Sequence, residues 1–436
     1  MRKGPAPGRI VSPAVDERDF DVVVFGATGI TGRQVAAYLA ERSAETGARW
    51  AAAARDPGKL EGVLGEAGIG SAETIVADRD DPDSLAAMAT RARVVLSLVG
   101  PYSLHGLPVI EACIGAGAHY ADLSGEIPFV RRVIDACDAR ARNAGVKLVQ
   151  VCGFEAMPPD LAVLLGAEAA RERWGESLAE ADLEVTLRRP PGLPRPSDLL
   201  SGGTLQSLPA GAGGEDAAVW VDPAALITDP KLAEAVRRRS PISVAPRRGP
   251  RGAVIAPLAP AAFINPAVIQ RTAAMFAAEA GAPGEPPRYR EGIAMRGSVA
   301  SLPLRYATAG AASGMQAAFG AIAKTRTPVR RRVTGALGKL LPSSGFGPTS
   351  DRQEEWRWGM SLAARTTGGN EVSVEIDAEG HPGYLATARM LGEAGLLLAD
   401  PELTPDRAGC LTPAMALGTE HLDRFEHAGV RFSVEG

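Results

Sequence analysis

Residues 20–32 read FDVVVFGATGITG and join a short apolar run to a glycine-rich turn. The run from Val22 to Phe25 is β-branched and aromatic, too short for a helix, and apolar at every position. Such a run is typical of a strand that is buried on both faces of a parallel sheet. The segment after the turn carries apolar residues at helical spacing from Val35 to Ala40. The stretch therefore predicts a strand, a sharp turn and a helix.

The turn between this strand and helix contains three glycines. A diphosphate is a bulky anion, so the backbone that binds it must approach closely; glycine removes the obstructing Cβ, and a helix start supplies unpaired N–H donors. The spacing is G-x-x-G-x-x-G instead of the dinucleotide fingerprint G-x-G-x-x-G. We interpret the turn as a dinucleotide site, with a purely structural turn as the alternative, and predict that Gly26→Val abolishes cofactor binding with the fold retained. The residues expected to bind the cofactor are Gly26, Thr28, Gly29, Ile30 and Gly32.

Arg55 follows a second predicted strand, at residues 49–54. NAD-preferring sites usually carry an acid at this strand end, which holds the ribose 2′-hydroxyl. Arg55 and Lys59 are instead suited to bracket a 2′-phosphate, because a guanidinium offers a planar fork to phosphate oxygens. NADPH is therefore favoured over NADH, and solvated surface charge is the alternative interpretation.

Two further strand ends are expected to complete the cofactor site. Asp78 follows a third strand, at the position where the adenine edge is often contacted. Gly100 and Tyr102 follow a fourth strand and are expected over the nicotinamide half, since ligands bind at the carboxyl ends of parallel strands. A simple Gly-Pro turn is the alternative at Gly100.

Strand and helix patterns alternate up to about residue 160. This alternation predicts an α/β fold with a doubly wound parallel sheet, the Rossmann arrangement, over residues 20–160. Residues 1–19 are rich in proline and glycine and lack the apolar region of a signal peptide, so we expect a disordered leader there.

The character of the chain changes after residue 160. Residues 161–382 contain strands that alternate with a period of two, which indicates a second, α+β domain that faces the substrate. Residues 383–436 contain two predicted helices, at 384–399 and 416–427, whose apolar surface needs a sheet to cover. We expect this C-terminal segment to fold back on the first domain.

The composition excludes several classes of protein. The chain has 436 residues, a net charge of −4 and 45% apolar residues, which is typical of a soluble globular protein with two domains. The charge and the lack of a basic cluster interleaved with aromatics argue against nucleic-acid binding. Four cysteines without a CxxC pair favour reduced thiols in a cytoplasmic protein over disulfides or zinc, so no metal is expected.

Residues 307–323 form a charge-free run rich in alanine and glycine, and a basic cluster around Arg331 follows it. The run is short and weakly apolar for a membrane-spanning helix. An ordinary covered helix and an interfacial, lipid-facing helix are both open interpretations. The basic cluster suits anionic headgroups or an acidic carrier protein, and solvated surface charge is the alternative.

Seven motifs occur in a fixed order along the chain. They are GATGITG at 26–32, AAARD at 52–56, VGPY at 99–102, HYADLSGE at 119–126, GFEAMPPD at 153–160, SGGTLQS at 201–207 and GCLTPA at 409–414. Together they resemble the saccharopine dehydrogenase-like oxidoreductases, and more specifically the branch that contains the trans-acting enoyl reductases of bacterial lipid and polyketide synthesis. The resemblance covers nearly the full length, and it departs from the usual pattern at Glu155, Ala156 and Cys410. Relatives usually have Asp and Ser at the first two of these positions.

The resemblance implies an NADP-binding Rossmann domain, a second α/β domain and a surface suited to lipidic material. In the glycolipid-forming members, a hydride is delivered to a carbon–carbon double bond of a carrier-bound acyl chain. We therefore expect an acyl or lipid-like substrate, carrier-bound or free. Peripheral attachment at the inner face of the plasma membrane and a homodimer are open expectations.

Enoyl reduction also needs a group that polarises the carbonyl and a source of a proton. Tyr102 is our first candidate to donate to the enolate oxygen, followed by Tyr120 and Ser124, with Glu126 or Asp122 orienting them. Tyr120 as a packed strand residue and Asp122 with Ser124 as a simple turn are the structural alternatives. A saccharopine-type or amine dehydrogenase and a non-catalytic NADPH-binding protein stay open as other function classes.

Overall fold

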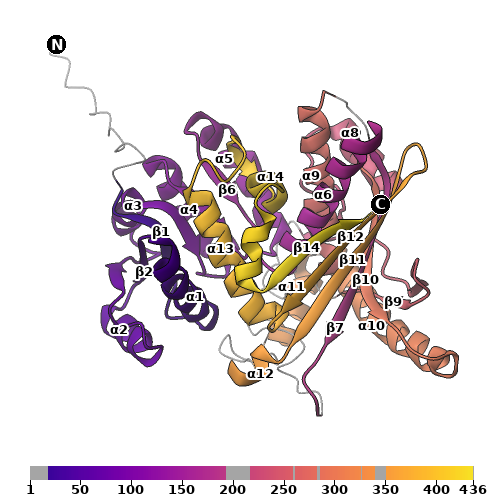
Figure 1. Cartoon of the computed structure of the whole chain (residues 1–436), viewed down its shortest axis with the longest axis horizontal. Helices are drawn as coiled ribbons and strands as arrows, with labels where there is room; N and C mark the ends of the chain where they lie inside the picture. Colours follow the sequence, from indigo (N-terminus) through magenta and orange to yellow (C-terminus); the bar gives the residue numbers. More distant parts are fainter. Residues whose placement is uncertain are drawn as a thin grey trace.

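Two seven-stranded sheets, A and B, organise the computed structural model (Figure 1). The model describes residues 18–192, 217–258, 261–281, 285–325, 327–338 and 350–435. The SGGTLQS motif and residues 1–17 of the expected leader lie outside these ranges.

Sheet A is parallel throughout and has the order β13-β6-β5-β4-β1-β2-β3. Its strands are β1 (Phe20–Phe25), β2 (Trp50–Ala54), β3 (Glu73–Val76), β4 (Ala92–Ser97), β5 (His119–Asp122), β6 (Lys147–Val149) and β13 (Gly409–Leu411). The helices between them are α1 (Ile30–Thr46), α2 (Pro57–Glu66), α3 (Pro82–Thr90), α4 (Tyr102–Ala116) and α5 (Ile127–Asn143). This order confirms the doubly wound sheet predicted from the alternating pattern.

Both faces of sheet A are covered, which explains the uninterrupted apolar run of β1. Val22 and Val24 belong to one buried cluster with α1 and α13 (Thr387–Ala399). Val23 and Phe25 belong to the opposite cluster, with α4 and α5. A strand with helices on both faces has no solvent side, so every position is apolar.

Sheet B is mixed and has the order β14-β12-β11-β7-β10-β9-β8. Its strands are β7 (Leu178–Arg188), β8 (Arg247–Arg248), β9 (Val254–Ala256), β10 (Arg288–Met295), β11 (Arg357–Thr366), β12 (Glu371–Glu379) and β14 (Val430–Glu435). The pair β7–β10 is parallel, and the other neighbours are antiparallel. The second sheet predicted from period-two patterning is thus present.

One buried core connects the two sheets. α6 (Met157–Trp174) starts after β6 of sheet A and packs on β11 and β12 of sheet B. Val22 of sheet A and Leu362 and Val374 of sheet B therefore fall in a single buried cluster. The remaining helices are α8 (Pro230–Arg239), α9 (Asn265–Glu279), α10 (Leu302–Ala323), α11 (Thr327–Gly338), α12 (Ser350–Glu354) and α14 (Pro413–Leu417). Among the described helices, none is both long enough and apolar enough to span a membrane.

The C-terminal segment returns to sheet A as predicted. α13 packs on α1 and β4, and β13 pairs with β6. The helix predicted over 416–427 is wrong, because α14 ends at Leu417 and Gly418 adopts a positive φ of 71°. A short 3₁₀ helix (Leu422–Ala428) follows, and β14 then extends sheet B beside β12.

Arg18, inside the expected leader, is a buried part of the fold. Its guanidinium donates to the carbonyl oxygens of Ala116 at 2.7 Å and Gly117 at 3.0 Å, and also to that of Ala92. Burial lowers the pKa of this guanidinium. Arg18 thereby ties the start of the described chain to β4 and the end of α4.

Candidate active site

The carboxyl ends of the sheet A strands form the edge where α/β proteins bind ligands. Gly26 follows β1, Arg55 follows β2, Asp78 lies just beyond β3, Gly100 lies beyond β4, and Ser124 lies beyond β5. The structure thus places the predicted cofactor and catalytic residues along one edge.

The three glycines of the first turn have different roles. Gly26 has φ +96°, and a Cβ there would lie 3.0 Å from Cγ2 of Val99. A Cβ on Gly32 would lie 2.3 Å from the carbonyl oxygen of Gly26, so the absence of a side chain allows α1 to pack on the turn. Gly29 has φ −78° and no such restriction, because its nearest neighbour would be 3.4 Å away. Gly26→Val would therefore strain the backbone, and the structure argues against the retained fold that we expected.

The start of α1 is an open anion site at this edge. Gly29 is its N-cap residue, no side chain caps the helix, and its first turn contains no acid. By contrast, Asp56 caps α2 by accepting from the amide of Lys59, and Asp81 caps α3 by accepting from that of Asp83. Uncapped N–H groups at a positive helix end favour a phosphate. The glycine turn therefore fits the diphosphate of a dinucleotide, held by amides next to Gly29 with Thr28 and Ile30 beside it.

The residues predicted at the adenosine end are placed as follows. Arg55 and Lys59 are exposed next to the end of β2, where cationic side chains can reach a 2′-phosphate. Asp78 is half-buried, and its carboxylate accepts from the amide of Asp80 at 3.1 Å. Asp78 is thus engaged in its own turn, whereas the two cations face solvent.

The predicted catalytic residues form one buried hydrogen-bonded group at the carboxyl ends of β4 and β5. Tyr102 donates to the carbonyl of Ser97 at 3.1 Å, and Tyr120 donates to Asp122 at 2.8 Å. The hydroxyl of Ser124 accepts from the amide of Glu126 at 3.3 Å. Burial raises the pKa values of both tyrosines well above the ordinary value, so the phenols stay neutral.

Tyr102 is the first residue of α4, not a loop residue as expected. The reason is Glu126, whose carboxylate accepts from the amides of Tyr102 at 2.8 Å and Ser103 at 3.0 Å and so caps the helix. Sequence reasoning did not find this cap, because Glu126 lies on the segment after β5 and reaches α4 only in the folded chain.

Asp122 connects the ends of β5 and β6. Its carboxylate accepts from the amides of Ser124 at 2.9 Å and Val151 at 3.3 Å. Val151 has φ +60°, a strained conformation for a β-branched residue that structures keep mainly at functional sites. Burial raises the pKa of Asp122 to about 7. The hydrogen bond from Val151 to Asp122 thus links the segment after β6, four residues before Glu155, to the end of β5.

Glu155 is the carboxyl group at this end that is not fully enclosed. It is half-buried, and among the described residues its own backbone amide is the donor that faces it. Burial raises its pKa, since no cation offsets the loss of solvent. Its charge also acts on Tyr102. The sequence signal for Glu155 was its departure from the usual Asp of this turn.

Apolar residues from outside sheet A pack against the same end. A Cβ on Gly125 would lie 2.8 Å from Cδ1 of Ile264, so the two segments touch there. The Phe154 and Trp358 rings meet edge to face, with centroids 4.9 Å apart. Thr387 fixes Phe154 by accepting from its amide at 3.0 Å. These contacts place apolar side chains next to the segments that follow β5 and β6.

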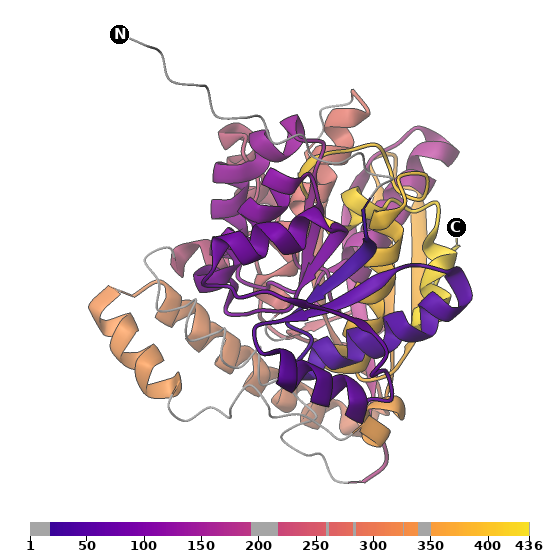
Figure 2. The same cartoon turned by 90° about the vertical axis from the view of Figure 1, so that its left-hand side faces the viewer.

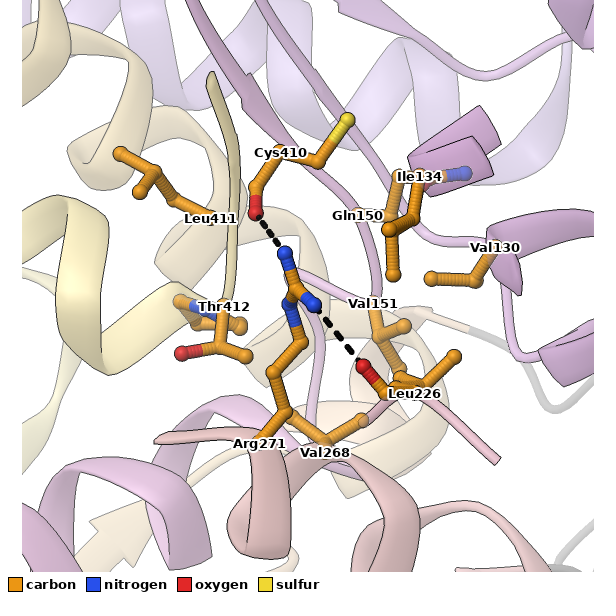
Figure 3. Close-up of a pocket in the computed structure, with 11 residues that line it drawn as sticks. Val130, Ile134, Gln150, Val151, Leu226, Val268, Arg271, Cys410, Leu411 and Thr412 are labelled. Carbon is orange, nitrogen blue, oxygen red and sulfur yellow. Dashed lines mark hydrogen bonds between the residues drawn. The ribbon is translucent and has the colours of Figure 1, made fainter. Parts of the chain in front are cut away.

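A small cavity lies beside the ends of β6 and β13 (Figure 3). Arg271 reaches across it and donates to the carbonyl oxygens of Leu226 at 2.8 Å and Cys410 at 2.7 Å, as the dashed lines in Figure 3 mark. About 10 Å³ is open to the centre of a water molecule, which is room for a single water. The cavity is therefore too small for a cofactor or an acyl chain. Arg271, on α9, instead links β13 to the segment around Leu226 by these two hydrogen bonds.

A wider basin of about 710 Å³ lies on sheet B, on the face opposite to α6. Its charges are largely paired: Arg296 contacts Glu184 at 2.7 Å, and Arg251 contacts Glu375. Within the described ranges, no group of three or more His, Cys, Asp or Glu side chains is arranged to hold a metal. The four cysteines are buried and free.

Comparison with known proteins agrees with this arrangement. Residues 22–149 match the family model described as the saccharopine dehydrogenase NADP binding domain. A trans-acting enoyl reductase of Mycobacterium ulcerans (strain Agy99) is 34% identical over 428 residues, which is 95% of this chain and 97% of the relative. A trans-acting enoyl reductase of Mycobacterium tuberculosis (strain ATCC 25618 / H37Rv) is 33% identical over 438 residues, 96% and 98% of the two chains.

The chain belongs to the saccharopine dehydrogenase-like oxidoreductases, in their trans-acting enoyl reductase branch. It is an NADP-dependent oxidoreductase, as the motifs predicted. Among solved structures, apo saccharopine dehydrogenase (L-Glu forming) from Saccharomyces cerevisiae aligns over 95% of this chain and 99% of its own, with 13% identity and a TM-score of 0.47.

Proposed function

We propose that this oxidoreductase reduces a carbon–carbon double bond next to the carbonyl of an acyl or polyketide chain during lipid synthesis. The observation that carries the proposal is the apolar packing beside the segments that follow β5 and β6, where Ile264 contacts Gly125 and Trp358 contacts Phe154. An amino-acid substrate would need a cation for its carboxylate, and the hydrogen bonds of Asp122, Glu126 and Glu155 at this end involve no Lys or Arg among the described residues. The names of the relatives agree with this substrate class.

Different residues of the chain bind the cofactor and surround the reacting groups. NADPH supplies a hydride when it is bound. The open start of α1 binds its diphosphate, and Arg55 with Lys59 selects its 2′-phosphate. The buried group of Tyr102, Tyr120 and Asp122 fixes the floor of the site, and the apolar residues above it exclude water, which strengthens the remaining polar contacts.

We assign the proton to Glu155. Its carboxyl group is half-buried at the nicotinamide end and has no cationic partner among the described residues, so it tends to keep its proton. A neutral carboxyl group can donate to the α-carbon or to the developing enolate oxygen. The hydroxyls of Tyr102, Tyr120 and Ser124 stay candidates for the same role, but each already holds a hydrogen bond within the buried group.

The function is tested by NADPH oxidation with enoyl thioesters of increasing chain length, with saccharopine, lysine and amines plus NADP⁺ as the comparison. We expect NADPH consumption and a saturated product with enoyl thioesters alone. Turnover of an amino acid or amine in place of the thioesters would contradict the proposal.

Glu155→Gln should lower kcat by about 10²- to 10⁴-fold, the range for a lost general acid, with KM changed little. Because the acid form is the active one and its pKa is raised, activity of the unaltered enzyme should fall as the pH rises through that pKa. This alkaline loss should be absent in Glu155→Gln, and Glu155→Asp should recover part of kcat. An unchanged pH profile in Glu155→Gln would return the role to Tyr102.

The peripheral attachment at the inner face of the plasma membrane and the homodimer predicted from the sequence remain part of this proposal. Sedimentation of the purified chain at several concentrations would decide the oligomeric state.

A further inference from the structure

The outward face of α10 is apolar. Leu304 and Met315 are 70% and 64% exposed. At 3.6 residues per turn they share one face with Thr308, Ala311 and Ile322, which are exposed or half-exposed as well. Single exposed apolar residues are ordinary, but a row of them along one helix face marks an interaction surface.

α10 also has no exposed charge. Its single charged residue is Arg305, which is buried and donates to the carbonyl oxygens of Met295 and Ser298, each at 2.9 Å. The buried side of the helix is otherwise formed by small or uncharged residues such as Ala309 and Ser313. The outward face is thus uncharged over its whole length.

The chain around α10 is free of acids. No Asp or Glu occurs between Glu291 and Asp351, whereas eight Lys and Arg residues do. Lys324, directly after α10, and Arg332, on α11, are exposed. The surface therefore combines an apolar row with cations at one end, in a segment that offers no negative charge to repel an anionic partner.

The arm, which we define as α10 and α11 (residues 302–323 and 327–338), extends from the body of the molecule. In Figure 2 these helices run out at the lower left, in light orange, beyond the layers around sheet A. Another exposed apolar residue, Val329 on α11, is 53% accessible. The arm thus carries exposed apolar residues on both of its helices.

The inner side of the arm leads to the nicotinamide end. Phe319 of α10 stacks on Phe263 with centroids 5.6 Å apart and meets Trp220 at 6.4 Å. The next residue after Phe263 is Ile264, which contacts Gly125 at the edge of sheet A. Aromatic and aliphatic side chains thus connect α10 with the site that we assign to the reaction.

We propose that the arm lies on an anionic lipid bilayer, with Leu304 and Met315 at the acyl boundary and Lys324 and Arg332 among the headgroups. A lipidic substrate would then reach the site past Phe319 and Phe263. This inference rests on the proposed function and deepens it, because it names the surface by which the chain attaches to the membrane; the attachment itself does not depend on which reaction is catalysed.

The charge distribution favours a bilayer over the other occupants. An acidic carrier protein would pair its carboxylates with cations on the contact face, but the outward face of α10 has none. An apolar face in one plane with cations at its end is the pattern of helices that lie in the membrane interface.

The test is co-sedimentation of the full chain with vesicles of phosphatidylcholine, alone or mixed with phosphatidylglycerol. We expect binding to the mixed vesicles that weakens with salt. Leu304→Glu combined with Met315→Glu should lower the partition at least tenfold. The matched control is Leu107→Glu with Trp174→Glu, which adds the same charge at exposed apolar sites outside the arm and should bind like the unaltered chain.

Lys324→Glu with Arg332→Glu should remove the preference for phosphatidylglycerol. Equal partition of the arm variant and the unaltered chain would overturn the proposal, as would failure of the unaltered chain to bind mixed vesicles. A third outcome would also overturn the proposal: the unaltered chain does not bind vesicles, and Leu304→Glu with Met315→Glu abolishes a dimer or binding to an acyl carrier protein. The outward face of α10 would then be the surface for that protein partner. Turnover of a short, water-soluble enoyl thioester should be equal in all variants and in the unaltered chain. If none of them turns it over, the proposed function fails, whatever the vesicle experiment shows.

Discussion

The helices α1 and α4 both begin at the carboxyl edge of sheet A, after the neighbouring strands β1 and β4, yet their first turns are satisfied in opposite ways. α4 receives the carboxylate of Glu126, which accepts from the amides of Tyr102 and Ser103. α1 receives no side chain at all. A helix start that is already occupied by a carboxylate repels a phosphate, whereas an open one attracts it. The contrast shows that the start of α1 is left without a carboxylate, whereas the starts of α2, α3 and α4 at the same edge each receive one.

The largest effect is expected when the open start of α1 is given a capping carboxylate, which removes its difference from α4. Gly29→Asp should place a capping carboxylate at an N-cap whose backbone accepts any residue. We expect NADPH affinity to fall about a hundredfold or more, since a diphosphate would meet a fixed negative charge. The melting temperature should be unchanged or higher, because an N-cap stabilises a helix by about 1 kcal/mol.

Gly29→Ala is the control for this variant, since it adds a Cβ without a charge. Calorimetric titration with NADPH should show a smaller loss than for Gly29→Asp. Equal affinity of Gly29→Asp and the unaltered chain would show that the diphosphate does not bind at α1.

The converse change removes the carboxylate that caps α4. Glu126→Ala should leave two amides at a buried site without their acceptor, at a cost of about 1–3 kcal/mol for each unsatisfied group. Denaturant unfolding measures the loss, and Glu126→Gln, which keeps one acceptor oxygen, should lose less. A wild-type stability in Glu126→Ala would mean that the α4 cap is dispensable.

A smaller effect is expected at the far end of the cofactor. Arg55→Asp should reverse the preference between NADPH and NADH, because a charge-assisted hydrogen bond contributes about 1.5–3 kcal/mol, or roughly ten- to a hundredfold in affinity. Binding of NADH should be retained, since the diphosphate site is untouched. If calorimetry finds the ratio of the two affinities unaltered, the 2′-phosphate lies elsewhere.

The smallest effect concerns pH. Burial raises the pKa of Asp122 from its ordinary value near 4 to about 7. The folded state therefore holds this proton more tightly than the unfolded chain, and the stability linked to it is fully present below the unfolded pKa and lost as the pH rises through about 7. Asp122→Asn should reduce the fall in melting temperature between acidic and mildly alkaline buffer. Asp160 and Glu291 shift in the same direction, so part of the fall should remain.

The sequence was sufficient where local chemistry decides the structure. The valine run and the glycines of residues 20–32 predicted β1, the turn and α1, since burial on both faces and a close helix approach leave a direct mark in residue types. The strand ends likewise located the predicted cofactor residues on one edge.

Features that depend on distant partners could not be read in the same way. β13 has three residues, GCL, which form a strand only because β6 is beside them. The cap of α4 comes from the segment after β5, and the positive φ of Val151 depends on Asp122. The helix predicted over residues 416–427 was wrong because the chain leaves the helix at Gly418. A single glycine inside an amphipathic pattern does not by itself indicate a helix end.

The late position of α13 and β13 affects how the protein is made. Val22, Val24 and Leu96 of sheet A are covered on one face by a helix that begins at Thr387. A nascent chain that has emerged only as far as α6 has α1 but lacks α13, so the part of this apolar face that α13 covers stays exposed. Ribosome-bound chains of that length should recruit chaperones, and an isolated nucleotide-binding fragment ending near residue 160 should aggregate even though its sequence reads as a complete domain.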